Sequence, residues 1–238
     1  MAGSSAATAP LPEELRPLAE RLFGEHLPRA QAYADMLASQ GVERGLIGPR
    51  EVDRLWDRHI LNCALLIDAI PADVRTLADV GSGAGLPGIV VAIARPDLEI
   101  ALIETMLRRT TWLQEVVDEL ELGHVEVIRG RAEELKGRQF DAVTARAVAA
   151  LDKLATWTLP LVAEGGHLLA MKGSSAAEEI EAAAGTLERL GGVDPQVIVV
   201  GEGESVAPTT VVSVRSTGRA ATGGRPRPGG ARHGRRAH

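Results

Sequence analysis

The sequence has a single cysteine and no long apolar run. Cys63 is the only cysteine, which excludes a disulfide within the chain and a zinc site made of paired cysteines, and fits a reducing compartment. No segment approaches the roughly 18 to 20 apolar residues of a membrane span, and the small, polar residues 1–10 lack the basic start and apolar stretch of a signal peptide. We therefore expect a soluble, cytoplasmic protein with no membrane partner and a disordered segment 1–10.

Positive charge is scarce outside the C-terminal end. The formal net charge is -6, but residues 217–238 hold six arginines and no acid, which leaves 20 basic and 32 acidic residues, or -12, for residues 1–216. Such a body cannot attract nucleic acid by bulk charge, so any RNA contact needs a local basic face or the tail. The tail is rich in glycine, proline and arginine without apolar periodicity, and we expect residues 217–238 to be disordered.

The rest of the chain can bury a core, because 45% of all residues are hydrophobic and the length suits one α/β domain with an extension. Apolar residues at helical spacing predict a helical region over residues 11–70, with Pro49 as the first residue of its third helix. From residue 71 to residue 216, short apolar runs alternate with amphipathic helices, which is typical of βαβ units and a parallel sheet. The predicted strands are Thr76 to Val80, Glu99 to Ile103, Val125 to Arg129, Ala142 to Ala145, His167 to Met171, Gln196 to Gly201 and Thr210 to Arg215. The predicted helices between them are Gly88 to Ala94, Arg109 to Leu120, Lys153 to Val162 and Ala176 to Leu190.

The last two predicted strands are joined by Glu202 to Pro208, a connection too short for the crossover that parallel strands need. This final pair is therefore predicted to be an antiparallel hairpin. The fold class is a seven-stranded, Rossmann-like α/β sheet, mostly parallel, preceded by the helical N-terminal region.

A glycine-rich turn follows the first predicted strand. Residues 83–88 match the pattern G-x-G-x-x-G, which alone is a weak signal for a dinucleotide site. Asp79 would repel a pyrophosphate, whereas S-adenosylmethionine brings an ammonium and a sulfonium that a carboxylate attracts. Glu104 follows the next strand, where nucleotide folds place an acid for ribose hydroxyls. The alternatives are a nicotinamide-dependent oxidoreductase, a non-catalytic nucleotide-binding protein that binds RNA, and a turn that merely joins strand to helix.

Five motifs, in this order, resemble the RsmG family, the bacterial 16S ribosomal RNA guanine-N7 methyltransferases first called glucose-inhibited division protein B. The resemblance covers about Gln31 to Arg215 and implies the methyltransferase variant of the doubly wound sheet. Asn62 stands where many members have aspartate, and the arginine-rich tail is outside the shared pattern. The motifs are Trp56-Asp57-Arg58-His59-Ile60-Leu61-Asn62, Gly81-Ser82-Gly83-Ala84-Gly85-Leu86-Pro87-Gly88-Ile89, Arg131-Ala132-Glu133, Phe140-Asp141-Ala142-Val143-Thr144-Ala145-Arg146-Ala147 and Met171-Lys172-Gly173.

The resemblance implies S-adenosylmethionine as cofactor, no metal, and 16S ribosomal RNA or the small ribosomal subunit as partner, and we expect a monomer. The candidate catalytic residues are Arg146 and Lys172, which end neighbouring strands and would form a phosphate-binding patch that orients the RNA. A surface salt bridge for Arg146 and a solvated Lys172 are the plain alternatives, as is a helix-starting turn for Ala132 and Glu133. The candidate cofactor-binding residues are Asp79, Gly81, Gly83, Gly85, Leu86, Glu104, Ala132, Glu133 and Arg146.

Two absences narrow the chemistry. Cys63 lies among Ala64, Leu65 and Leu66, so it is interpreted as a small buried residue and not as the activated nucleophile that methylation of pyrimidine C5 requires. The D/N-P-P-aromatic sequence of amino-group methyltransferases is also missing after the fourth strand. Methylation of a ring nitrogen or an oxygen remains. His59 is either a structural residue or a contact to cofactor or RNA, and the three tryptophans are expected in the core.

Overall fold

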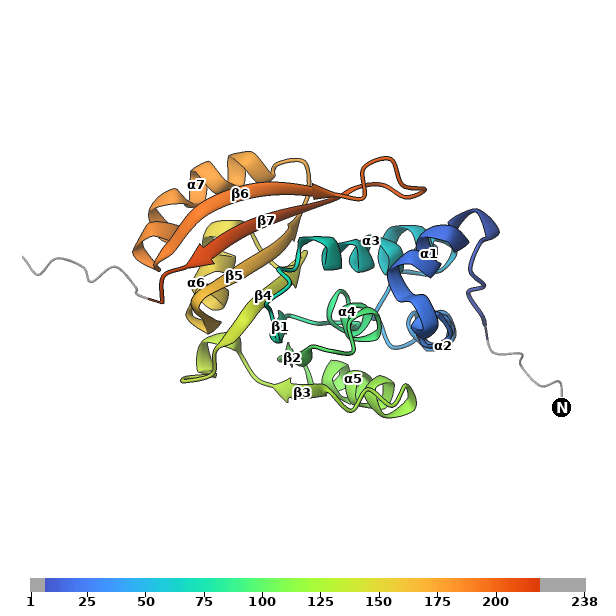
Figure 1. The fold of residues 1–238 in the computed structure, drawn as a ribbon. Helices are drawn as coiled ribbons and strands as arrows, with labels where there is room; N and C mark the ends of the chain where they lie inside the picture. The colour runs from blue at the N-terminus through green and yellow to red at the C-terminus, as the bar shows by residue number, and fades with distance from the viewer. Residues whose placement is uncertain (1–6, 219–238) are drawn as a thin grey trace, which may run out of the picture.

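The computed structural model describes residues 7–218. Over this range the strands form one seven-stranded sheet in the order β3-β2-β1-β4-β5-β7-β6 (Figure 1). The expected disorder of residues 1–6 and of the tail beyond Gly218 falls outside the described residues. The strands are β1 (Thr76–Val80), β2 (Glu99–Glu104), β3 (Val125–Arg129), β4 (Phe140–Arg146), β5 (Val162–Lys172), β6 (Gly192–Val200) and β7 (Thr209–Ser216).

The sheet is mostly parallel, as the sequence predicts. β1 pairs in parallel with β2 and β4, while β2 pairs with β3 and β4 with β5 in the same sense. The predicted C-terminal hairpin of β6 and β7 is antiparallel. β7 is inserted between β5 and β6 and runs antiparallel to both, an arrangement that the sequence pattern did not specify.

Helices cover both faces of the sheet (Figure 1). One face carries α6 (Leu151–Thr158) and α7 (Ala176–Arg189), whose buried side chains form one hydrophobic cluster with the strands. The other face carries α4 (Gly88–Ala94), α5 (Leu107–Glu119) and the N-terminal helices, which share a second cluster. The N-terminal helices are α1 (Arg16–Phe23), α2 (Leu27–Gln40) and α3 (Leu61–Ala64).

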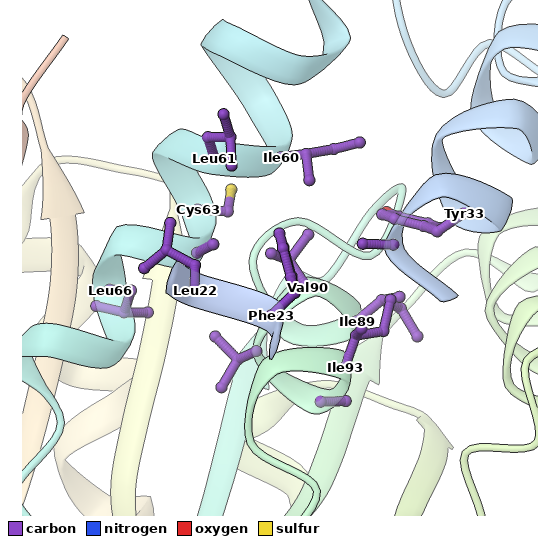
Figure 2. Close-up of a cluster of buried hydrophobic side chains, with 14 of the residues drawn as sticks. Leu22, Phe23, Tyr33, Ile60, Leu61, Cys63, Leu66, Ile89, Val90 and Ile93 are labelled. Atoms are coloured by element: carbon purple, nitrogen blue, oxygen red, sulfur yellow. The ribbon is translucent and has the colours of Figure 1, made fainter. Parts of the chain in front are cut away.

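The composition of α4 explains why the N-terminal helices are needed. Its sequence, Gly-Ile-Val-Val-Ala-Ile-Ala, is apolar all round, and its residues 88–93 are buried. A helix without a polar face must be covered on every side. Figure 2 shows how this is achieved: Ile89, Val90 and Ile93 meet Phe23 of α1 and Tyr33 of α2 in one cluster. The N-terminal region therefore completes the core instead of forming a separate unit.

The segment after Pro49 is not the single α-helix that we expected. It passes through the 3-10 helix η3 (Pro49–Arg54), the π-helix η4 (Leu55–Ile60), α3 and the 3-10 helix η5 (Leu65–Ala69). The buried side chains of the π-helix are Leu55, Trp56 and Ile60.

The N-terminal segment is held more firmly than its composition suggests. We expected residues 1–10 to be disordered, but residues 7–10 lie against the helices. The Ala9 amide donates to Asp35 at 2.8 Å, and its carbonyl accepts hydrogen bonds from Gln31 at 2.9 Å and from Trp56 Nε1 at 2.8 Å. Ala9 is also buried, so three long-range hydrogen bonds attach this residue to α2 and to Trp56.

Candidate active site

A cavity of about 900 Å³ lies at the carboxyl ends of β1, β2, β3 and β4, the edge at which open α/β sheets gather ligands. Its size is within the range of small-molecule sites. Most of the residues that the sequence marked for cofactor binding line it: Gly81, Gly83, Leu86, Glu104, Ala132, Glu133 and Arg146. Asp79, Gly85 and Lys172 do not line it.

The glycine-rich turn is fixed by two aromatic donors. The Ala84 carbonyl accepts hydrogen bonds from the Tyr33 hydroxyl at 3.0 Å and from Trp112 Nε1 at 2.8 Å. Both aromatic side chains are fully buried, and they come from α2 and α5. The turn is therefore held between the N-terminal region and the helix that follows β2. The predicted helical N-terminal region thus supports the cavity wall.

Gly85 lies behind the turn. Its φ is +106°, and a Cβ atom there would lie 2.6 Å from Cγ1 of Ile89 and 2.9 Å from the Tyr33 hydroxyl. Only glycine fits such a backbone angle and such close neighbours. Gly85 therefore packs the turn against α4 and α2, while Gly81 and Gly83 face the cavity.

Asp79 lies beneath the turn and has no exposed surface. Its Oδ2 accepts a hydrogen bond from the Gly88 amide at 3.0 Å. The first N–H donor of α4 is therefore already bonded to this carboxyl group. Its Oδ1 is buried and has no hydrogen-bond partner within residues 7–218. Burial raises the pKa of Asp79 to about 7, although the hydrogen bond from the Gly88 amide lowers it. The pKa of this carboxyl also responds to Glu104 and Arg146, both of which line the cavity.

Glu104 ends β2 with a carboxylate that is only 4% exposed. Oε1 accepts hydrogen bonds from the amides of Thr105 at 2.7 Å and Met106 at 2.9 Å, and Oε2 accepts one from Gly83 at 3.0 Å. Arg109 lies 3.5 Å from Oε2, and its buried Nε has no partner within the described part of the chain. Three backbone amides therefore hold the Glu104 carboxylate beside the glycine turn, and the Arg109 guanidinium lies next to it.

The segment after β3 forms the next part of the cavity wall. Ala132 and Glu133 belong to the 3-10 helix η6 (Ala132–Glu134), and both line the cavity. Trp157 of α6 lines it as well, although we expected this side chain in the core. The other two tryptophans, Trp56 and Trp112, are buried as expected.

Arg146 ends β4 and turns towards the N-terminal region. Nη1 donates to Cys63 Sγ at 3.0 Å, and Nη2 lies 3.1 Å from the Arg58 carbonyl oxygen and 3.2 Å from His59 Nδ1. Cys63 is buried, and burial raises the pKa of its thiol to about 11 although Arg146 lowers it. The thiol is therefore protonated at neutral pH, which agrees with its interpretation as a small buried residue and not a nucleophile.

Lys172 does not join Arg146. Arg146 pairs with Met171 in the β4–β5 ladder, and Lys172 is the next residue along β5. Successive side chains of a strand point to opposite faces of the sheet, so Lys172 lies on the α7 face. Its Nζ donates to Glu179 of α7 at 2.7 Å and to the Ala149 carbonyl at 2.6 Å, and its side chain is 8% exposed. The structure therefore does not bring Arg146 and Lys172 together, and the Lys172 side chain is paired and mostly buried.

Sequence reasoning missed three residues at the site: Tyr33, Glu51 and Arg109. Arg109 had a usable signal, because it is a cation at the start of the predicted helix that follows Glu104. Tyr33 and Glu51 had none, since both reach the site only through packing of the N-terminal helices.

Metal-binding clusters and membrane-spanning helices are considered next for the described residues. Within residues 7–218, no cluster of three or more histidine, cysteine, aspartate or glutamate side chains has the arrangement of a metal site. None of the helices in the same range combines the length and the apolar composition of a membrane span.

The fold is that of class I methyltransferases. The ribosomal protein L11 methylase from Lactobacillus delbrueckii subsp. bulgaricus superposes with a TM-score of 0.50 at 14% identity, over 66% of this chain and 77% of that chain. At that level the likeness concerns the fold alone.

Sequence comparison then identifies the family. The family profile described as rRNA small subunit methyltransferase G matches residues 26–206, and the chain belongs to this family of methyltransferases. Ribosomal RNA small subunit methyltransferase G from Pseudarthrobacter chlorophenolicus is 55% identical over 202 residues, which are 84% of this chain and 93% of that protein. The protein of the same name from Salinispora arenicola is 52% identical over 232 residues and 94% of each chain.

Proposed function

We propose that this chain binds S-adenosylmethionine and transfers its methyl group to N7 of one guanosine in 16S ribosomal RNA. The observation that carries the proposal is the cavity itself. A rigid carboxylate, Glu104, stands beside a glycine turn at the carboxyl end of the sheet, in a chain whose relatives are named ribosomal RNA small subunit methyltransferases.

The residues present suit this cofactor. Glu104 is placed for ribose hydroxyls and the backbone of Gly81 and Gly83 for the methionine part, while Ala132 and Glu133 border the remaining space for adenine. Asp79 lies beneath the turn and does not line the cavity, so its carboxyl group would act on the ammonium and sulfonium of the cofactor through charge at a distance and not by contact.

The cofactor, when bound, supplies an electrophilic methyl group, and the protein has to hold the acceptor in line with it. Guanine N7 has a free lone pair and carries no proton, so no general base is required. Among the groups that line the cavity, Arg146 is suited to orient the base. A guanidinium can donate to guanine O6 and leave N7 free, whereas the common bidentate contact to O6 and N7 would block the nucleophile.

A nicotinamide-dependent oxidoreductase is the weaker candidate. The first amide of α4 is already bonded to Asp79, so a pyrophosphate at that position would meet a carboxyl group instead of a free donor. A non-catalytic, RNA-binding protein could bind the nucleotide in the same cavity. Only the formation of methylated RNA distinguishes this function from the proposed one.

The test combines binding with product analysis. Calorimetry should show micromolar binding of S-adenosylmethionine or S-adenosylhomocysteine and none of NAD. Incubation with labelled cofactor and either 16S ribosomal RNA or small subunits, followed by chemical cleavage at 7-methylguanosine, should then give one cleavage site. Tight binding without cleavage would leave the non-catalytic role, and a preference for NAD would refute the proposal.

A matched pair of variants checks the site. Glu104→Gln should weaken cofactor binding by about 1.5 to 3 kcal/mol for each charge-assisted hydrogen bond that it loses. Glu99→Gln changes an exposed glutamate at the opposite end of the same strand and should leave the affinity unchanged. Equal affinities for the two variants would place the ribose elsewhere.

A further inference from the structure

Arg146 belongs to the sheet, but its side chain is held by the N-terminal region. An arginine has five N–H donors and no acceptor. Its contacts to Cys63, the Arg58 carbonyl and His59 occupy three of them. Within residues 7–218 the other two have no hydrogen-bond partner, and the side chain lines the cavity. The orientation of the free donors is therefore set by the groups that hold the other three.

Among the three groups that contact Arg146, the His59 ring also contacts another charged side chain, that of Glu51. Its Nε2 lies 2.6 Å from Oε2 of Glu51, and its side chain is 14% exposed. Because Arg146 can only donate, Nδ1 of His59 must accept, and the ring proton must sit on Nε2, from which it is donated to Glu51. The contacts thus require one tautomer of a neutral imidazole.

The backbone supports the same arrangement. Arg58 and His59 lie in the π-helix η4, and a π-helical turn inside a helical segment is frequently associated with a functional site. The turn presents the Arg58 carbonyl and the His59 ring to the same Nη2 atom. Glu51, from η3, completes a chain of contacts along the cavity wall, because Glu51, His59 and Arg146 all line the cavity.

We propose that His59 and Glu51 are positioning residues for Arg146: Glu51 holds the His59 ring, and the ring holds the guanidinium so that its free donors face the bound guanosine. The proposal rests on the proposed function for the identity of the guanosine, but the chain of contacts stands without it. Protonation of Nδ1 would replace the acceptor by a donor and break the contact between His59 and Arg146, which fixes the guanidinium together with Cys63 and the Arg58 carbonyl.

The charged groups around His59 determine the pH at which its ring becomes protonated and its contact with Arg146 breaks. Burial lowers the pKa of His59 from its ordinary value, and the nearby cations Arg146 and Arg58 lower it further, while Glu51 raises it. The net direction is downward, so the neutral ring is present at pH 7 and the contact breaks at pH values below the ordinary titration range of histidine.

The first experiment needs no substrate. In protein labelled with ¹⁵N-histidine, His59 should be the neutral Nε2–H tautomer at pH 7. Its titration midpoint should rise in Arg146→Ala, which removes a cation, and fall in Glu51→Gln, which removes an anion. A protonated ring at pH 7, the Nδ1–H tautomer, or a midpoint that is unaffected by Arg146→Ala would overturn the proposal, whatever the protein does to RNA.

The second experiment uses a pair of amide variants in single-turnover methylation of RNA with saturating cofactor. The His59→Asn side chain can place an acceptor near the Nδ1 position, whereas His59→Gln places its amide near Nε2 and leaves Arg146 with only the Cys63 and Arg58 acceptors. We expect His59→Gln to lower the rate, or raise the KM for RNA, by about tenfold or more, and His59→Asn to stay within about threefold of the unmodified protein. Cofactor affinity should change less than twofold in both.

The pH profile separates positioning from simple folding effects. The unmodified protein should lose activity at pH values below the ordinary titration range of histidine, where His59 becomes protonated, and this acid limb should disappear in His59→Asn. Equal losses in both amide variants, or an acid limb that persists in His59→Asn, would refute the positioning role. If the unmodified protein makes no 7-methylguanosine, the proposed function fails, and the NMR experiment still decides the contact.

Discussion

The bonds to the Ala84 carbonyl lead to a prediction that can be worked out quantitatively. Tyr33→Phe removes one of the two donors, the hydroxyl at 3.0 Å, and leaves the Trp112 bond at 2.8 Å in place. The carbonyl stays satisfied, so the expected loss is that of one net hydrogen bond, about 0.5 to 1.5 kcal/mol of the free energy of unfolding. Tyr33 is fully buried, but phenylalanine keeps the aromatic ring, so the substitution leaves little cavity.

Trp112→Phe removes the other donor and part of a large buried side chain, so it should be more destabilising, by roughly 2 to 4 kcal/mol. In the double variant the carbonyl loses both partners and stays in a buried position. Leaving a buried acceptor unsatisfied adds about 1 to 3 kcal/mol beyond the sum of the two single changes. The structure therefore predicts a positive coupling energy of that size in the double-mutant cycle.

The assay is urea unfolding of the four proteins at one pH, with the comparison restricted to transitions of equal denaturant dependence. Tyr33→Phe should also weaken cofactor binding modestly, because the turn loses one of its two anchors. Additivity within about 0.5 kcal/mol would mean that the two donors do not share the Ala84 carbonyl. The role of Tyr33 and Trp112 as joint donors to the glycine turn would then be refuted.

Three further predictions concern single residues. The unfolded-state carboxyl of Asp79 ionises near its ordinary pKa of 3.8 and the folded one near about 7, so the free energy of unfolding should fall as pH rises through that window. In urea titrations, Asp79→Asn should reduce the pH dependence of the free energy of unfolding between pH 5 and pH 7 by up to about 1.4 kcal/mol per pH unit. The same pH dependence in the variant and the unmodified protein would show that Asp79 is ionised throughout. Lys172→Ala should reduce stability by about 1 to 3 kcal/mol through its lost bonds to Ala149 and Glu179, with RNA affinity in a filter-binding assay nearly unchanged; weaker RNA binding at unchanged stability would return Lys172 to the site. Gly185→Ala, in the exposed middle of α7 with no atom near an added Cβ, should raise the thermal midpoint, since alanine is favoured over glycine in a helix by about 1 kcal/mol, and a lower midpoint would contradict the open surroundings seen there.

The sequence by itself determined the sheet and the family. The alternation of apolar runs with amphipathic helices depends only on local periodicity, and it placed β1 and α4 at the bounds that the structure shows. The glycine turn and Glu104 were found because both follow strands directly, so their place at the carboxyl edge is fixed by the chain's local order. The short connection after β6 likewise required an antiparallel pair.

Tertiary structure alone decided which candidates meet. Arg146 and Lys172 end neighbouring strands, but the register of β4 and β5 puts Arg146 beside Met171 and sends Lys172 to the opposite face. Asp79 precedes the turn in sequence, yet the close approach of α4 buries it beneath the turn. Tyr33 and Glu51 reach the site over long sequence separations, through the packing that covers the all-apolar α4. A periodic pattern specifies which side of an element is buried, but the register between strands and the partner of each buried face arise only when the elements pack together.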